Sequence, residues 1–214
     1  MDALILAAGF GSRMGDLTKK IPKPLLSINQ KPLIAYAIEL IENLPFDNIY
    51  VNTHYQADIL HRFLKQNYPH IKISHEVNIL GTGGGIKKIQ NQDIFILNTD
   101  NLWQPEFKLE IKNAMSFFQK NNLIESLLLI NSKSNFLDLD ISNNSTINFP
   151  PIKKNTQFQG CHFLRHGALN SYPEIFDIPK YWKDCSQRNK LYGYETSGFN
   201  SHIGTKELYL KYQK

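Results

Sequence analysis

The chain has 214 residues, 42% hydrophobic and 12% aromatic, which is enough to bury one full core. Its net charge of +5 comes from scattered lysines, and no apolar run could span a bilayer, so we expect neither a nucleic-acid nor a membrane partner. The first residues lack the charged segment of a signal peptide, and the two cysteines, Cys161 and Cys185, form no disulfide pattern, so we expect a cytoplasmic protein.

The chain opens on an apolar stretch, ALILAA, that runs into a loop with Gly9 and Gly11. Arg13 follows, and Lys23 stands between two prolines. Glycines let backbone N–H groups approach oxygens that a Cβ would block, and both cations suit phosphate. The spacing excludes a P-loop, and Met14 replaces the third glycine of a dinucleotide fingerprint. We predict a phosphate-binding loop; the alternative is a tight turn after a buried strand.

Strands and helices alternate along the chain, which predicts an α/β fold with a mainly parallel sheet. Strands are expected at 3–8, 48–52, 71–75, 94–98, 126–131 and 158–164. Helical spacing of apolar residues predicts helices from Pro32 onward, around 59–64, over 107–118 and 178–190, and after Thr205 as N-cap. Residues 132–160, rich in Ser, Asn, Lys and Pro, predict a β-hairpin or a loose insertion.

Four residues mark the carboxyl ends of predicted strands: Gly9, Asn52, His75 and Asp100. Ligands of parallel α/β sheets bind beyond these ends. We therefore expect one ligand to meet all four regions. His54, His75, His162 and His166 show no metal-ligand pattern and are expected at the surface or in the core.

Six motifs together resemble the sugar-1-phosphate nucleotidyltransferases (NDP-sugar pyrophosphorylases). They are LAAGFGSRM with PKPLL, KPLIAYAIELI, VNTHYQADIL, LGTGGGIKK, ILNTDN and HIGTKELYL. The resemblance covers most of the chain, is specific up to residue 105 and is loose between about 130 and 190. It is strongest to short bacterial members similar to N-acetylmuramate-1-phosphate uridylyltransferase. It implies a Rossmann-like three-layer fold and one domain over 1–214, with 1–105 as the nucleotide-binding half and 106–214 as the sugar-binding and closing half.

The activity implied by the resemblance is transfer of a nucleotidyl group from a nucleoside triphosphate, UTP first, to a sugar 1-phosphate. The products are a nucleotide-sugar for the cell wall and pyrophosphate. Alternatives in the same class are a mannose-1-phosphate guanylyltransferase and a phosphocholine-type cytidylyltransferase. A different alternative is a catalytically weak nucleotide-sugar-binding protein with a regulatory role. The sequence leaves the oligomeric state open.

The resemblance also assigns site residues. Arg13 would hold the β- and γ-phosphates and the leaving pyrophosphate, and Lys23 the α-phosphate and the incoming phosphate. Asp100 would bind Mg²⁺, for which a hard carboxylate oxygen is suited; a turn role is the alternative. The other nucleotide-binding residues implied are Ala8, Gly9, Gly11, Ser12, Gly81 and Thr82. The glycines at 81 and 83–85 are expected to form a loop against the base, ahead of a helix that begins near Ile86. The sugar contacts implied are Gly160, Asn98 and Glu195.

One position departs from the family pattern. The closing motif of the family carries a second metal-binding aspartate, and His202 stands in its place here. Imidazole is a poorer magnesium ligand than carboxylate. His202 would therefore bind the ion as a neutral imidazole or contact phosphate, would favour Mn²⁺, or would mark a site that has lost activity.

Overall fold

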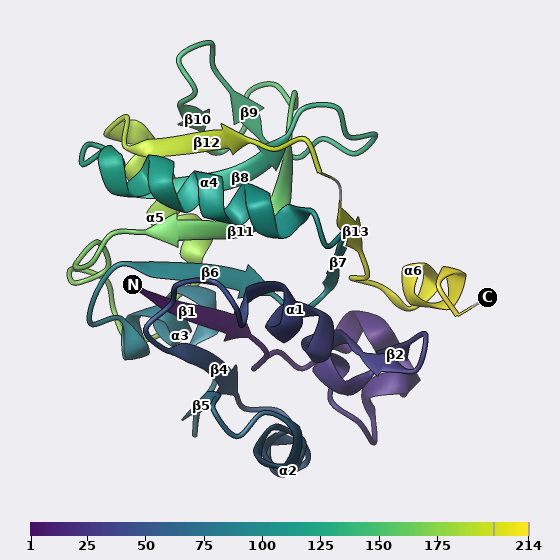
Figure 1. Ribbon diagram of the computed structural model, residues 1–214. Coiled ribbons are helices and arrows are strands. Elements are labelled where there is room, and N and C mark those ends of the chain that lie inside the picture. The colour runs from purple at the N-terminus through teal and green to yellow at the C-terminus, as the bar shows by residue number, and fades with distance from the viewer. Residues whose placement is uncertain (199, 214) are drawn as a thin grey trace. The chain divides into compact units, whose positions relative to one another are not determined.

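The computed structural model of the chain describes residues 1–198 and 200–213 (Figure 1). The chain divides into two compact units. Unit 1 comprises Met1–Ile79, Leu97–Trp103 and Asn200–Lys214, and unit 2 comprises Leu80–Ile96 and Gln104–Phe199. In the part of the chain that is described, no helix combines the length and the apolar character that crossing a membrane requires.

The main sheet has seven strands: three belong to each unit, and β6 (Ile94–Asn98) has residues in both. Unit 1 contains β1 (Asp2–Leu6), η1 (Ser12–Thr18), η2 (Lys23–Leu25), β2 (Ser27–Ile28), β3 (Lys31–Pro32), α1 (Leu33–Ile41), β4 (Ile49–Thr53), α2 (Ala57–Asn67), β5 (Lys72–His75), β7 (Asn101–Trp103), β13 (Asn200–His202) and α6 (Lys206–Lys211). Unit 2 contains α3 (Gly81–Ile89), α4 (Phe107–Lys120), β8 (Ser126–Asn131), β9 (Asp140–Ile141), β10 (Ile147–Asn148), β11 (Gln157–Leu164), α5 (Ile178–Gln187) and β12 (Leu191–Glu195).

The three strands that unit 1 alone contributes to the main sheet, β1, β4 and β5, are parallel. β1 pairs with β4, and β4 pairs with β5. The register sets Leu6 opposite Asn52 and Thr53 opposite His75, so the carboxyl ends of the three strands lie at one edge. This arrangement confirms the expected α/β class with a mainly parallel sheet.

A small core in unit 1 supports the glycine-rich loop. Met14 is fully buried in it, packed with Leu26, Leu33, Ile203 and Tyr209. The C-terminal segment therefore returns to the first loop of the chain. Thr205 caps α6 as expected, because its hydroxyl accepts a hydrogen bond from the Leu208 N–H.

The strands of unit 2 are covered by helices on two faces (Figure 1). β12 runs parallel to β8, and β11 runs antiparallel to it. Phe163 on β11 stacks on Phe118 of α4, whereas its neighbour His162 packs edge-on against Trp182 of α5. Successive residues of a strand point to opposite faces, so α4 and α5 lie on opposite sides of β11. This helix–sheet–helix arrangement is the three-layer form that we expected.

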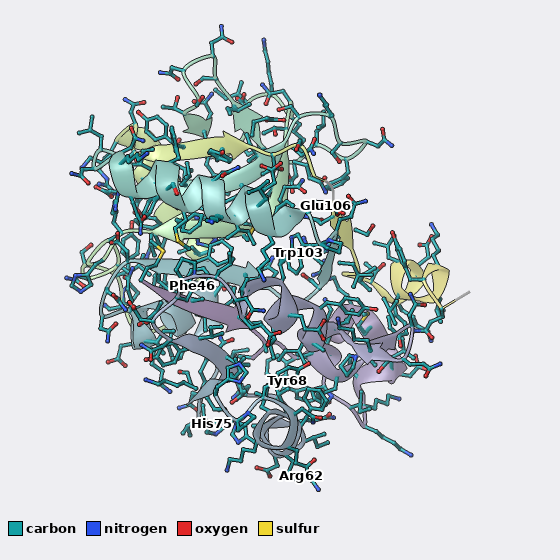
Figure 2. The ribbon with its side chains drawn as sticks, in the orientation of Figure 1. Phe46, Arg62, Tyr68, His75, Trp103 and Glu106 are labelled. Atoms are coloured by element: carbon teal, nitrogen blue, oxygen red, sulfur yellow. The ribbon has the colours of Figure 1, made fainter. Side chains whose placement is uncertain are left out.

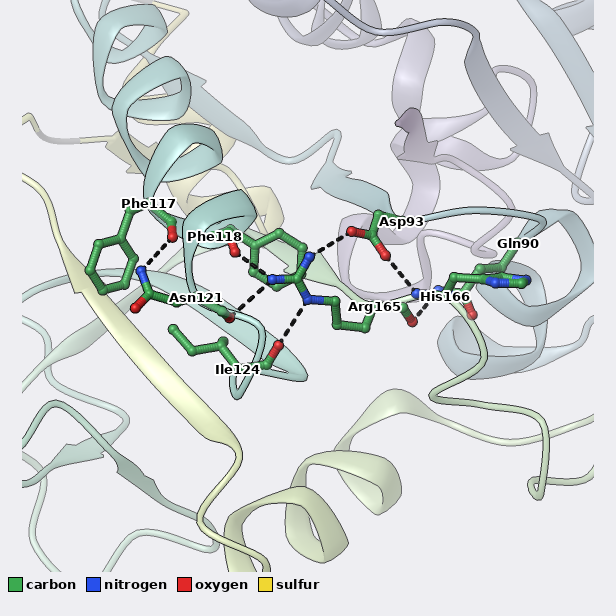
Figure 3. Close-up of polar contacts among 8 residues, drawn as sticks. All are labelled: Gln90, Asp93, Phe117, Phe118, Asn121, Ile124, Arg165 and His166. Carbon is green, nitrogen blue, oxygen red and sulfur yellow. Dashed lines mark hydrogen bonds and ion pairs between the residues drawn. The ribbon is translucent and has the colours of Figure 1, made fainter.

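Arg165, just after β11, fastens this strand to the end of α4 (Figure 3). Its guanidinium donates to the carbonyls of Phe118, Asn121 and Ile124 and to the Asp93 carboxylate, and it stacks over the Phe118 ring. Arginine suits the carbonyl end of a helix because its donors form a planar fork and its charge complements the helix dipole. These bonds identify Arg165 as a structural cation of unit 2.

The insertion between β8 and β11 is a short β-hairpin, one of the two forms predicted for residues 132–160. β9 and β10 pair antiparallel with only two residues each. Asp140 fixes its base by accepting from Asn148 and from the Ile152 and Lys153 N–H groups. The hairpin therefore belongs to unit 2 and is not a linker.

Candidate active site

Two glycines of the first loop have different structural roles. Gly11 has a left-handed backbone (φ +66°), and a Cβ there would lie 2.9 Å from Thr18 and 3.1 Å from Lys23. Only glycine lets the loop pack so closely on the lysine. Gly9 has no positive φ, and a Cβ there would meet no described atom within 4 Å. Neither backbone conformation nor packing within the chain explains glycine at position 9.

The two predicted cations, Arg13 and Lys23, differ in their exposure and in the backbone that holds them. Arg13 precedes the buried Met14, and its side chain is 64% exposed. Lys23 begins η2, where the Leu25 and Leu26 N–H groups return to Pro22 and Lys23, and its side chain is only 12% exposed. The sequence therefore places one exposed and one buried cation next to the loop.

The structure brings three of the predicted residues, Arg13, Lys23 and His202, together around a fourth, Asp100. The Lys23 Nζ donates to Asp100 Oδ2 at 2.7 Å, and Arg13 and His202 each come within 3.9 Å of the carboxylate. All four belong to unit 1 although they span 190 positions of the chain. Two cations and one anion give this group, which we call the Asp100 cluster, a net charge of +1 with His202 neutral.

Burial and charge oppose each other in the Asp100 cluster. Burial alone would raise the pKa of Asp100, but its interactions with Lys23, His202 and Arg13 outweigh burial and lower it. Burial lowers the pKa of Lys23, and the attraction of Asp100 offsets this only in part. The two shifts have the same origin, because both groups lie largely out of water and each charge depends on the other.

A two-stranded sheet places His202 next to Asp100. β13 pairs antiparallel with β7, with His202 opposite Asn101, and the Ile203 N–H donates to the Asp100 carbonyl. The His202 Nδ1 lies 3.1 Å from Asn101 Oδ1, so with the amide oxygen as acceptor Nδ1 carries the proton. The ring lies over Gly204, where a Cβ would be 1.9 Å from Nε2.

The donor set around Asp100 fits a magnesium ion held mainly through substrate. Mg²⁺ in proteins usually has one or two carboxylate ligands and completes its shell with phosphates and waters. Asp100 supplies one carboxylate, with the His202 imidazole beside it. Within residues 1–198 and 200–213, no group of three or more His, Cys, Asp and Glu could hold a metal ion. The residues therefore suit an open site and not a closed protein cage.

The segment after β5 differs from its predicted form. We expected a glycine loop with a helix from about Ile86, but α3 begins at Gly81. A Cβ at Gly83 would lie 2.3 Å from the Phe176 ring, so the helix packs directly on residues 174–176. The Thr82 N–H and hydroxyl both donate to Asp177. The ring that lies against these glycines in the structure is a protein side chain.

Two of the three predicted sugar contacts, Gly160 and Glu195, have structural roles within unit 2. Gly160 in β11 has φ +75°, and the register of β11 on β8 shifts between Phe158 and His162, so a β-bulge there requires glycine. The Glu195 carboxylate accepts from the Ser132 N–H at 2.7 Å and from its hydroxyl at 2.9 Å. Both belong to unit 2, whereas Asn98 ends β6 in unit 1.

Two of the four expected strand-end residues are used inside unit 1. Asn52 is 3% exposed and bonds to the Ala7 N–H and to Glu76. His75 faces α2, packing edge-on against His61 (Figure 2). The buried Glu76 was missed by sequence reasoning, because its partner becomes visible only through the pairing of β4 with β5.

The chain is similar in sequence to curated sugar-1-phosphate nucleotidyltransferases. The chain is 23% identical over its full length to the D-glycero-alpha-D-manno-heptose 1-phosphate guanylyltransferase of Aneurinibacillus thermoaerophilus, covering 97% of that protein. It is 25% identical over 94% of its length to the N-acetylmuramate alpha-1-phosphate uridylyltransferase of Caulobacter vibrioides, covering 91% of it. The chain spans only part of three further curated relatives, covering 35%, 63% and 51% of their own lengths.

A solved structure shares the fold. HddC from Yersinia pseudotuberculosis, crystallised in complex with GMP-PN, superposes with a TM-score of 0.77 at 22% identity, over 99% of this chain and 97% of that one. The family model described as nucleotidyl transferase matches residues 2–135, more than half of the chain. The match includes Arg13, Lys23 and Asp100. The chain therefore belongs to the nucleotidyl transferase family, as its motifs implied.

Proposed function

We propose that the chain transfers a nucleotidyl group from a nucleoside triphosphate to a sugar 1-phosphate and releases pyrophosphate. The observation that carries the proposal is the Asp100 cluster: a buried lysine and an exposed arginine beside a single carboxylate, next to a loop with an unexplained glycine. A net positive cluster attracts phosphate, and the Asp100 carboxylate supplies one ligand for a divalent ion.

The chemistry needs positioning more than covalent help. An oxygen of the sugar phosphate attacks the α-phosphorus, and the bond to the bridging oxygen of the β-phosphate breaks, so pyrophosphate leaves with the electron pair. Lys23 would hold the α-phosphate and the attacking phosphate, because its position is fixed by Asp100 at 2.7 Å. Arg13, being exposed, would close on the β- and γ-phosphates and stabilise the leaving group.

The backbone N–H groups of the first loop would face the triphosphate. Open space at Gly9 lets an oxygen approach the chain where a Cβ would otherwise stand. Gly11 keeps the loop packed on Lys23, so the loop N–H groups and the Lys23 ammonium group would bind the same phosphate. Ala8 and Ser12, on either side of the glycines, complete this phosphate-binding loop.

Asp100, with His202 beside it, would hold Mg²⁺ or Mn²⁺, which when bound neutralises charge on the phosphate oxygens. His202 contributes an imidazole where a second carboxylate would cancel the positive charge of the cluster. For the remaining substrate contacts we keep the assignments from sequence: Gly81 and Thr82 to the base, and Gly160, Asn98 and Glu195 to the sugar.

We propose UTP as the donor, in line with the resemblance to the uridylyltransferases. GTP is the second candidate, because the Aneurinibacillus relative, matched over 97% of its length, is named a guanylyltransferase. A cytoplasmic setting, where nucleoside triphosphates are made, is part of the same proposal and suits the two free, buried cysteines.

The test is pyrophosphate release from UTP, GTP, CTP and dTTP with Mg²⁺ or Mn²⁺, against N-acetylmuramate, N-acetylglucosamine, glucose and mannose 1-phosphates and phosphocholine. Release with one pair would support the proposal and identify base and acceptor. Lys23→Met should abolish it, whereas Lys31→Met, which breaks the surface pair of Lys31 with Glu39, should not. Folded protein that binds nucleotide but releases nothing with any pair would favour the regulatory binding protein.

A further inference from the structure

We propose that Asn52, Glu76 and Thr99 are positioning residues that set the phosphate-binding loop relative to Asp100. Their target is the single peptide group between Leu6 and Ala7, where the chain leaves β1 and enters the loop. The inference rests on the proposed function, because it assigns a role in the same site. It adds three buried side chains, none of which lies among the cations or the metal ligand assigned above.

The Leu6–Ala7 peptide is held from both sides by side chains. Its N–H donates to Asn52 Oδ1 at 2.7 Å, and its carbonyl accepts from the Thr99 hydroxyl at 3.0 Å. Asn52 is 3% exposed and Thr99 6% exposed, so water competes with neither bond. Two opposed bonds on one planar group fix its rotation about the chain axis.

Glu76 fixes the orientation of the Asn52 amide. The Asn52 Nδ2 donates to Glu76 Oε1 at 2.8 Å, and Glu76 is 1% exposed. A backbone N–H can only donate and a carboxylate can only accept, so the amide can satisfy both neighbours in one orientation alone. The order Ala7 N–H, Asn52, Glu76 is therefore a directional chain of hydrogen bonds, which we call the Asn52 relay.

The same peptide connects the two halves of the proposed phosphate site. Ala8 and Gly9 follow it directly, and Thr99 is the residue before Asp100. A rotation of the peptide would move the loop amides and the Asp100 carboxylate relative to each other. Displacements of about 1 Å in a catalytic arrangement can cost about 100-fold in rate. The relay is therefore expected to act on turnover more than on nucleotide affinity.

The directional order of the relay allows a swap experiment. Asn52→Asp keeps an acceptor for the Ala7 N–H but sets a second carboxylate against Glu76. Glu76→Gln keeps an acceptor for Asn52 Nδ2. The double variant Asn52→Asp with Glu76→Gln restores both hydrogen bonds of the relay, the second with its direction reversed, because the new glutamine can donate to the new aspartate. A double-mutant cycle measures how far the effect of both substitutions together departs from the sum of their separate effects.

We expect Asn52→Asp to lower kcat at least about tenfold, with KM for the triphosphate changed less than about threefold. Glu76→Gln and the double variant should stay within about threefold of the wild type in kcat. Amide hydrogen exchange of the peptide covering Ala7 should be faster in Asn52→Asp and return to the wild-type rate in the double variant. This second readout needs no turnover, so it tests the relay even if the proposed function fails.

The same strand pair contains a matched control. Asn48, just before β4, donates to Asp2 of β1 at 2.8 Å, at the opposite end of the strands. Asn48→Asp creates the same clash of carboxylates, and the double variant Asn48→Asp with Asp2→Asn relieves it. We expect the control variants to change the free energy of unfolding but to leave kcat within about twofold.

Additive losses in the Asn52 and Glu76 variants, or unchanged kcat and exchange in Asn52→Asp, would overturn the proposal. So would an equal loss of kcat in the Asn48 control. If Asn52→Asp does not fold, a folded and active double variant supports the relay. If neither folds, substitutions of Thr99 provide the test. Thr99→Ser keeps the hydroxyl and should retain kcat, whereas Thr99→Val removes it and should lower kcat. Equal kcat in these two variants would refute the positioning role of Thr99 and with it the proposal.

Discussion

Gly9→Ala and Gly11→Ala form a pair of substitutions that should separate binding from stability. At position 11 the left-handed backbone costs a residue with a Cβ about 1–2 kcal/mol. The new methyl group would also lie 2.9 Å from Thr18 and 3.1 Å from Lys23, and such overpacking costs about 1–3 kcal/mol. Gly11→Ala should therefore lose about 2–5 kcal/mol of unfolding free energy.

At position 9 the same methyl group meets no described atom within 4 Å, and the backbone has no positive φ. We expect the unfolding free energy of Gly9→Ala to stay within about 0.5 kcal/mol of the wild type. The methyl group would nevertheless stand where phosphate oxygens approach the loop. A loss of about 100-fold in kcat/KM, equivalent to about 2.7 kcal/mol, is expected if one preorganised donor is blocked.

Urea unfolding and steady-state pyrophosphate release, on the same preparations, measure the two effects. The expected pattern is a stable but slow Gly9→Ala and a destabilised Gly11→Ala. Unchanged kcat/KM in Gly9→Ala would refute the phosphate contact at that loop position. Gly11→Ala as stable as the wild type would refute the packing argument, and with it the reason why the loop lies against Lys23.

Three further substitutions test the site and the interior of unit 2. Asp100→Asn should lower turnover at least about 100-fold and raise the Mg²⁺ concentration needed for half-maximal rate, because the only carboxylate of the cluster is gone; a normal Mg²⁺ titration would argue against its role. His202→Asp should increase the ratio of Mg²⁺- to Mn²⁺-supported turnover, and a collapse with both ions would show that the imidazole has a role of its own. Burial lowers the pKa of His162 from 6.5 to about 3. Between about pH 6.5 and pH 3 the imidazole is therefore protonated in the unfolded chain but neutral in the folded one, so the free energy of unfolding falls as the pH falls through that range. Between pH 7 and 4.5 the wild type should therefore lose about 2–3 kcal/mol more than His162→Phe in urea unfolding, and equal losses would contradict a buried neutral imidazole.

Six of the seven strands of the main sheet were predictable because each is a short apolar run between polar residues, whereas β12 was not predicted. β6 and β8 have the predicted bounds, and β1, β4 and β5 differ from prediction by one or two residues at an end. The glycine run at 81–85 was misread as a loop, because local propensity disfavours glycine in a helix. Its helical form depends on Phe176, which lies more than 90 positions away and leaves no room for a side chain.

The polar supports of the site were less accessible to sequence reasoning. Asn52 was expected to face a ligand because it ends a strand. Its actual partners, Ala7 and Glu76, are fixed by the register of three strands, and a register cannot be read from one motif. Gly160 was assigned to the sugar through the resemblance, whereas its backbone shows a bulge that would require glycine in any case.

The charge of the Asp100 cluster gives a reason for histidine at position 202. With aspartate there, two cations would face two carboxylates and the net charge would be zero. With neutral histidine the net charge is +1, so the cluster attracts phosphate more strongly and a divalent ion less strongly. His202→Asp should therefore weaken nucleotide binding measured without metal and strengthen the dependence of binding on Mg²⁺. If metal-free binding is unchanged, the imidazole has been retained for a reason other than charge, such as its bond to Asn101.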